Sequence, residues 1–187
     1  MDAMEIIASF ADIVPVPWAN GAGETTELVS LDASTALTPD RRSWRLSIAR
    51  LERTGPFSSL PGLDRTFLPT DAEVVLDIAG TAHRAGPGSP LRFSGSDAVA
   101  LTDLAAPTFA VNLMVVTDEA TLPPLTMMLE PTTILDPTGT AEPGESARPR
   151  FALALTDGPH WRRFDLLRLG DDDAMGPGDR LGGIGFA

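Results

Sequence analysis

Short apolar runs separated by glycine, proline and aspartate are the feature that most constrains the fold of this 187-residue chain, which holds 17 glycines and 17 prolines. Runs of this length and composition are typical of β-strands. Helical periodicity of useful length is hard to find. A spacing of roughly ten residues between turn signals favours a sandwich or barrel, so we expect an all-β fold. The predicted strands are residues 13–16, 27–31, 44–51, 73–78, 91–93, 99–101, 109–116, 126–129, 151–155 and 164–169.

The run from Trp44 to Leu51 gives the clearest strand signal, because its residues alternate in polarity. Successive side chains of a strand point to opposite faces of the sheet. The pattern therefore predicts one apolar face and, on the other, Arg45 and Ser47 side by side. The apolar face holds Trp44, Leu46 and Ile48, with Leu51 as its least regular member, and the opposite face holds Arg45, Ser47 and Ala49.

A chain of 187 residues is near the size of one domain and can bury on the order of 70% of its unfolded surface. We expect a single compact unit over residues 1–187. Weakly repeated Gly, Pro and Asp turns leave open a duplicated architecture of two intertwined halves, about 1–120 and 121–187. Residues 137–149 are small, polar and flanked by proline, so a mobile surface loop is predicted there.

Composition excludes several functions. A net charge of −12 opposes nucleic-acid binding, since phosphate contacts need clustered basic residues. The chain has no lysine and no cysteine, which rules out Schiff-base chemistry, thiolate nucleophiles and disulfides. The first residues are acidic, unlike a signal peptide, and no window approaches the ~20 apolar residues of a membrane span. We therefore expect a cytoplasmic protein without a nucleic-acid or membrane partner.

Metal and cofactor binding are poorly supported. His83 and His160 are the only histidines, lie in polar turns by sequence, and show no His-x-His cluster. A carboxylate site through Asp171–Asp173 is the remaining alternative, although an acidic loop is commoner. No Gly-x-Ser-x-Gly elbow appears, and residues 20–26 lack the lysine of a P-loop. The sequence predicts no metal and no cofactor.

Arginine recognition of an anion is the chemistry that remains. Arg65 follows a Gly-Pro turn beside Asp64, and its guanidinium is suited to a bidentate carboxylate contact. The alternative is that Arg65 pairs with an acid and only pins two strands. Asn112 lies inside an apolar run, where its amide needs partners either in the core or in a pocket.

Five blocks of the sequence, in order, resemble the HutD/Ves family of cupin-like proteins. They are residues 17–27, 44–49, 55–58, 61–65 and 112–114. The resemblance implies a cupin-like jelly-roll barrel, duplicated as in bicupins, without an assigned enzymatic activity. Some members accompany histidine-degradation genes, which implies urocanate or formylglutamate as the ligand. Ala22, where many relatives carry glycine, and residues 68–72 depart from the family pattern.

We hypothesise metal-independent binding of a small carboxylate metabolite, regulatory or sequestering, in histidine or amino-acid catabolism. Arg65 contacts the carboxylate in this hypothesis, and the chain is not an enzyme. The further ligand-binding candidates are Arg45 and Asn112 as polar partners, Trp18 and Phe57 as apolar walls, Asn20 and Glu27 as residues that shape or enter the pocket, and Ser58.

Two other functions stay open at this point. In the first, the protein is an isomerase or lyase acting on a small acid, and burial raises the pKa of Glu27 so that it acts as general base. In the second, the barrel is filled by side chains and the protein has a purely structural or interaction role. A homodimer formed through an exposed sheet edge is compatible with each function.

Overall fold

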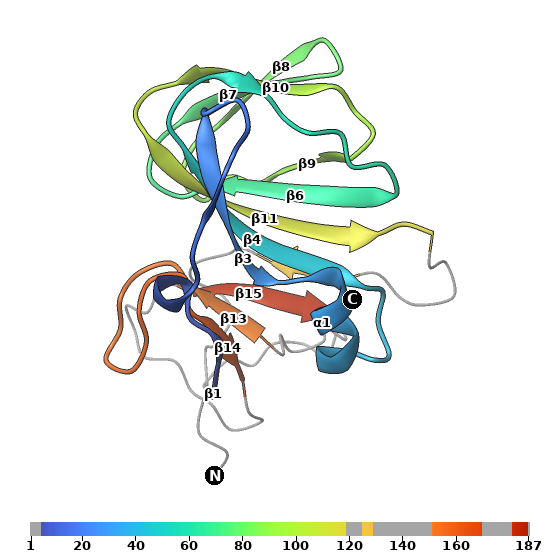
Figure 1. Cartoon of the computed structure of the whole chain (residues 1–187), viewed down its shortest axis with the longest axis vertical. Coiled ribbons are helices and arrows are strands. Elements are labelled where there is room, and N and C mark those ends of the chain that lie inside the picture. Colours follow the sequence, from blue (N-terminus) through green and yellow to red (C-terminus); the bar gives the residue numbers. More distant parts are fainter. Residues whose placement is uncertain (1–4, 119–124, 129–150, 170–180, 187) are drawn as a thin grey trace, which may run out of the picture. The chain divides into compact units, whose positions relative to one another are not determined.

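The computed structural model describes residues 5–118, 125–128, 151–169 and 181–186 (Figure 1). Contacts within the chain divide it into two units. The larger unit is Ile13–Leu122, and the smaller unit joins Met1–Asp12 to Pro123–Ala187. The first twelve residues thus belong with the C-terminal part of the chain. Residues 137–149 and Asp171–Asp173, for which a mobile loop and an acidic site were predicted, lie outside the described residues.

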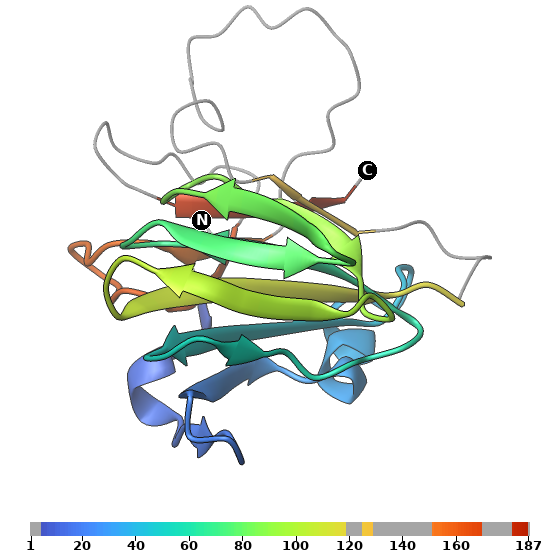
Figure 2. The same ribbon diagram turned by 90° about the horizontal axis from the view of Figure 1, so that it is seen from above.

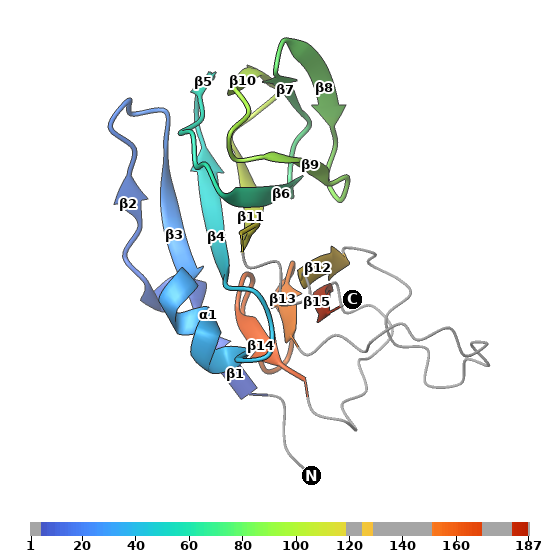
Figure 3. The ribbon, with the colours of Figure 1, turned by 90° about the vertical axis from the view of Figure 1, so that its right-hand side faces the viewer.

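The larger unit is built from two antiparallel sheets. Figure 2 shows its strands running in alternating directions, and Figure 3 shows β2, β3, β4 and β11 side by side. The six-stranded sheet has the order β2 (Val16–Pro17), β3 (Gly23–Val29), β4 (Trp44–Leu51), β11 (Thr108–Val116), β6 (Leu63–Pro69) and β9 (Leu91–Ser94). The four-stranded sheet has the order β5 (Gly55–Pro56), β10 (Val99–Leu104), β7 (Val74–Ile78) and β8 (Thr81–Ala85).

Apolar side chains from both sheets of the larger unit form its core. The six-stranded sheet contributes residues such as Leu51 and Phe67, and the four-stranded sheet contributes Leu76 and Leu101. All four side chains are almost completely removed from solvent. Burying a side chain of this size stabilises the fold by roughly 1.5–3 kcal/mol. The prediction of an all-β, cupin-like jelly roll is confirmed, although the described strands form separate sheets rather than a closed barrel.

The smaller unit contains a five-stranded antiparallel sheet. Its order is β1 (Glu5–Ala8), β14 (Leu166–Arg168), β13 (Phe151–Ala154), β15 (Leu181–Phe186) and β12 (Leu125–Met128). A 3-10 turn at Phe10–Asp12 follows β1, and the Phe10 ring packs edge-on against Phe164 at 5.3 Å between centroids. The buried Asp165 carboxylate accepts a 2.7 Å hydrogen bond from Ser9 Oγ. These contacts hold the N-terminal segment against the C-terminal strands.

One short α-helix, α1 (Leu31–Leu37), interrupts the strands of the larger unit. Ser30 caps it, with Oγ accepting a 3.1 Å hydrogen bond from Ala33 N, and the helix stops at Thr38, before Pro39. Its seven residues are too few for helical periodicity to be visible in the sequence. The capping serine and the proline are the sequence features that mark its ends. No helix in the described parts of the chain is long and apolar enough to cross a membrane.

The strand predictions differ in accuracy. The strand at 44–51 is confirmed at both ends, and the predictions from residue 73 onward overlap β7 and β9–β14. The strand at 13–16 is wrong except at Val16: Val14 is 84% exposed beside Pro15, which lacks the N–H for strand pairing. Leu31 begins the helix instead of ending a strand. His83 lies within β8 and not in a turn, because the reversal occurs at Ala79–Gly80.

Five further strands gave no clear signal in the sequence. They are β1, β5, β6, β8 and β15. In β8, exposed polar residues replace the apolar alternation that strand recognition depends on. Leu51 was also assigned to the wrong face, since it follows Arg45 by six residues and shares that face of β4.

The close approach of β3 and β4 gives a first prediction. A Cβ atom at Gly23 would collide with the backbone carbonyl oxygen of Arg50, which cannot move without breaking the strand pairing. We expect Gly23→Ala to lower the free energy of unfolding by about 2 kcal/mol or more, measured by urea denaturation. Gly86→Ala is the control, because a Cβ atom added there would have no other atom within 4 Å. Equal effects of the two changes would contradict this account.

Candidate binding site

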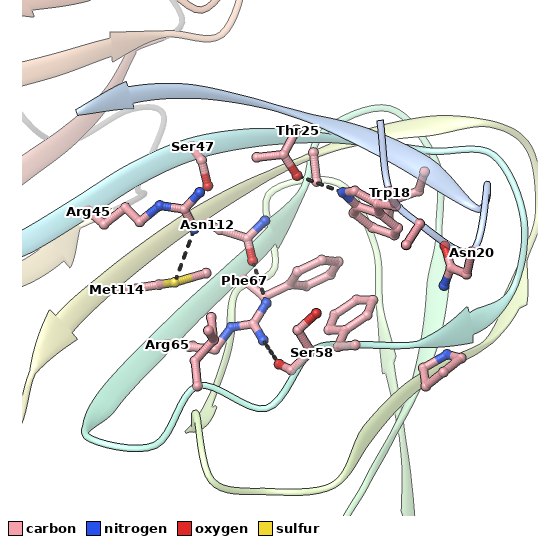
Figure 4. A pocket seen from close by; sticks show the side chains of 16 residues that line it. Trp18, Asn20, Thr25, Arg45, Ser47, Ser58, Arg65, Phe67, Asn112 and Met114 are labelled. Carbon is pink, nitrogen blue, oxygen red and sulfur yellow. Dashed lines mark hydrogen bonds between the residues drawn. The ribbon is translucent and has the colours of Figure 1, made fainter. Parts of the chain in front are cut away.

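A cavity of about 340 Å³ opens on the inner face of the six-stranded sheet (Figure 4). This volume suits a small metabolite. The lining residues all belong to the larger unit: Trp18, Ala19, Asn20, Thr25, Arg45, Ser47, Ala49, Leu51, Pro56, Phe57, Ser58, Leu60, Arg65, Phe67, Asn112 and Met114. Of the eight predicted ligand-binding residues, only Glu27 is not among them.

Strand register brings the polar lining residues together. In β11, Asn112 lies between Ser47 of β4 and Phe67 of β6, and Met114 lies between Arg45 and Arg65 of the same strands. Because side chains alternate with a period of two, these two rows point to the same face. Residues separated by as many as 69 positions thus meet on one surface.

Arg65 is the most unusual of these residues. Its side chain lies between the rings of Phe57 and Phe93, with Cζ 5.3 and 5.1 Å from their centroids, and the residue is only 7% exposed. Nη2 donates a 3.1 Å hydrogen bond to Asn112 Oδ1, and Nη1 approaches the Ser58 carbonyl oxygen at 3.5 Å. Nε has no hydrogen-bond partner. No ion pair joins Arg65 to a carboxylate within the described ranges.

The surroundings of Arg65 disfavour its charge. Burial, and secondarily the nearby Arg45 cation, lower the pKa of Arg65 to about 10. The guanidinium is therefore still protonated at neutral pH. Since one pKa unit corresponds to about 1.4 kcal/mol, holding this charge costs the folded state roughly 3 kcal/mol. A bound anion would offset that cost. Asp64, the chain neighbour of Arg65, is exposed on the opposite side of β6.

Arg45 differs from Arg65 because it has an acidic partner. Its Nε donates to Glu27 Oε2, and its Nη1 contacts the Met114 sulfur at 3.8 Å. The Glu27 side chain is 42% exposed. Glu27 therefore lacks the burial that the general-base hypothesis assumed.

Asn112 supplies the donor beside Arg65. It is 4% exposed, and acceptance of the Arg65 hydrogen bond through Oδ1 fixes the orientation of its amide. In Figure 4 the amide nitrogen points away from Arg65, on the cavity side of β11. The buried hydroxyl of Ser47 lies on the neighbouring strand. These groups can hydrogen-bond a ligand oxygen or nitrogen.

Aromatic side chains form the other end of the cavity. Trp18 packs edge-on against Phe57 at 6.3 Å between centroids, and Phe57 packs against Phe67 at 5.7 Å. The Trp18 indole donates a 2.8 Å hydrogen bond to Thr25 Oγ1, which fixes the ring. Asn20 Oδ1 accepts a 3.0 Å bond from Ala22 N, so this side chain shapes the turn beside Trp18.

Sequence reasoning missed several lining residues, among them Thr25, Phe67 and Met114. Each lies two positions from a predicted site residue in the same strand: Thr25 from Glu27, Phe67 from Arg65, and Met114 from Asn112. Extending each candidate by the strand period of two would have found them. Leu60 lies outside any strand, and no sequence signal marked it.

The lining residues include no aspartate, glutamate, histidine or cysteine. Among the residues that the structure describes, no group of three or more such side chains could hold a metal ion. What the cavity offers is a buried cation, a second cation with an acidic partner, neutral hydrogen-bonding groups and aromatic walls. The class of protein that this fold and cavity define is a cupin-like protein whose cavity holds one buried cation among neutral and aromatic groups.

Comparison with known proteins identifies the family. The HutD family profile matches residues 10–136, more than half of the chain, and the chain belongs to this family. Protein Ves of Citrobacter koseri is 34% identical over 98 residues, which cover 50% of this chain and 49% of that protein. Protein Ves of Cronobacter sakazakii is 35% identical over 95 residues, covering 48% and 50%. The match thus spans about half the length of these curated relatives.

Two solved structures share the fold along nearly the whole chain. HutD from Pseudomonas fluorescens SBW25 superposes with a TM-score of 0.65 at 25% identity, covering 99% of this chain and 100% of that one. A conserved protein of unknown function from Pseudomonas aeruginosa PAO1 gives a TM-score of 0.62 at 20% identity, covering 98% and 89%. The resemblance to HutD/Ves and the cupin-like fold are thereby confirmed.

The cost of the buried charge gives a second prediction. Arg65→Met keeps a long apolar side chain between the two phenylalanine rings and removes the unpaired cation. We expect the free energy of unfolding of the ligand-free protein to stay within about 1 kcal/mol of wild type or to rise, in denaturant titration. Leu76→Ala, a core control, should cost about 2–5 kcal/mol. A comparable loss for Arg65→Met would make Arg65 a structural residue.

Proposed function

We propose that this protein binds a small carboxylate metabolite in the cavity, without a metal ion, through Arg65. One observation carries the proposal: no carboxylate of the described residues pairs with the buried Arg65 guanidinium, which lines a cavity that contains no acidic lining residue. A protein with a net charge of −12 has many acids that could have paired with this arginine. Folded chains keep an uncompensated buried charge mainly where a ligand completes it.

The neighbouring groups support recognition of a carboxylate in particular. Asn112 and the Ser58 carbonyl oxygen accept hydrogen bonds from the guanidinium. These contacts hold its planar set of N–H donors in one orientation. Carboxylates match that geometry with two parallel hydrogen bonds. The rings of Trp18 and Phe57 can pack against the rest of a small organic acid.

Membership of the HutD family supports a role in histidine or amino-acid catabolism, where binding would regulate or sequester a metabolite in the cytoplasm. Urocanate and formylglutamate are the candidate ligands. The Pseudomonas fluorescens HutD structure is described for a formate condition, and formate is the smallest carboxylate. Binding is favoured over turnover because the lining residues supply no carboxylate or imidazole that could act as general base.

Direct titration tests the proposal. We expect isothermal titration calorimetry with urocanate and formylglutamate, in the presence of EDTA, to show saturable binding of at least one acid. Arg65→Met should weaken that binding by roughly a hundredfold or more, because it removes the charged partner of a buried contact. The control is Arg84→Met, which removes an exposed arginine paired with Glu73 outside the cavity. Equal binding by both variants, or no binding of any acid by wild type, would refute the proposal.

The titration of Arg65 predicts the pH dependence of binding. Only the protonated guanidinium attracts a carboxylate, and burial lowers the pKa of Arg65 to about 10. For a ligand that does not itself titrate, affinity should stay constant from about pH 6 to pH 9 and fall only above about pH 10. A calorimetric midpoint near pH 6.5, typical of histidine, would contradict recognition by Arg65.

A further inference from the structure

The side-chain amides of the cavity lining present hydrogen-bond donors. Asn112 Oδ1 accepts from Arg65, and Asn20 Oδ1 accepts from Ala22 N. Both partners can only donate, so they fix the orientation of the two side-chain amides. Among the described residues, these contacts occupy the amide oxygens and leave the amide N–H groups of Asn112 and Asn20 for a ligand.

Hydroxyl groups add to this set of donors. The Trp18 indole N–H can only donate, so Thr25 Oγ1 accepts from it and the Thr25 O–H is left to donate elsewhere. Ser47 contributes a buried hydroxyl on the strand next to Asn112 (Figure 4). A ligand that carries acceptors, such as an acyl oxygen, an imidazole nitrogen or a second carboxylate, matches these groups.

The charges of the lining disfavour a cationic ligand group. Arg65 and Arg45 are cations, and neither aspartate nor glutamate lines the cavity. Glu27 is bound to Arg45 Nε outside the lining, so an ammonium would have to displace Arg45 to reach it. An ammonium that moves from water into this cavity therefore loses its hydration without meeting a carboxylate of the lining.

An α-amino acid bound through its α-carboxylate cannot keep its ammonium away from Arg65. Its nitrogen and this carboxylate are bonded to the same carbon, so the nitrogen lies within about 4 Å of both carboxylate oxygens. When Arg65 binds that carboxylate, the ammonium lies beside the buried cation, and like charges repel. An amino acid that binds through a side-chain carboxylate still brings its ammonium into a lining without an acid.

We propose that the cavity selects carboxylic acids whose α-nitrogen is acylated or absent and rejects the corresponding free α-amino acids. The inference rests on the proposed function and defines the ligand class of the same site. An acylated nitrogen is neutral, and its acyl oxygen can accept hydrogen bonds from the donors of the lining. Such acids are related to amino acids by N-acylation or by loss of ammonia, so the protein distinguishes the two sides of such a reaction.

Two series of ligands isolate the α-ammonium. Histidine, N-acetylhistidine and imidazolepropionate carry a free, an acylated and no α-nitrogen on one skeleton, and glutamate, N-formylglutamate and glutarate form the second series. Calorimetric titration at neutral pH gives a discrimination ratio for each series. This ratio is the Kd of the free amino acid divided by the Kd of the tighter-binding of its two partners. We expect a wild-type ratio of roughly ten or more in the series that binds more tightly.

Ser58→Asp tests the cause of this discrimination. Ser58 lines the cavity, and its carbonyl oxygen lies 3.5 Å from Arg65 Nη1. An acid at this position can pair with the ligand ammonium, so the ratio should fall about tenfold. Leu60→Asp, at another lining position, is the second variant if the acid at position 58 pairs with Arg65 and abolishes all binding.

The matched control is Ser89→Asp. It adds the same charge at an exposed position outside the lining and should leave the ratio unchanged. Two results would overturn the inference while leaving carboxylate binding in place: a wild-type ratio near one, or the same ratio in the lining variants as in Ser89→Asp. If wild type binds no member of either series, the proposed function fails together with the inference.

Discussion

The antiparallel pairing of β11 with β4 on one side and β6 on the other is the constraint on which the site depends. This register places Met114 between Arg45 and Arg65, and Asn112 between Ser47 and Phe67. A slip of one residue would turn every one of these side chains to the other face of the sheet. The apolar core of the larger unit fixes the register, because Leu51, Phe67 and Ala110 must face the four-stranded sheet.

The same inner face of the six-stranded sheet contributes to both the core and the cavity. Its apolar part packs against the four-stranded sheet, and its polar part lines the cavity. Aromatic rings around Arg65 exclude water. This desolvation destabilises the charged form of the guanidinium and lowers the pKa of Arg65. Low local dielectric also strengthens the attraction of any anion that enters. The two arginines differ because, within the part of the chain that the structure describes, Arg45 pairs with a carboxylate and Arg65 does not.

Much of this arrangement followed from strand periodicity. The limits of β4 and the shared face of Arg45 and Ser47 were predicted correctly, because alternation over eight residues is a strong local signal. The segment at 13–16 and helix α1 were not, since prolines and a seven-residue length hide the relevant patterns. The exposure of Glu27 was missed because it depends on the bulge that follows it and on its cross-strand contact with Arg45.

The sequence alone determined the available chemistry: an acidic, all-β chain of the HutD/Ves type, with arginine as its only strong cation and neither cysteine nor lysine to react. Only the tertiary structure decided which arginine lacks an acidic partner, because that depends on contacts between distant strands. Arg65 and Asn112 are 47 positions apart, and Arg45 and Glu27 are 18 positions apart. Local patterns set the face on which a side chain lies, and the register of the sheet sets its neighbours.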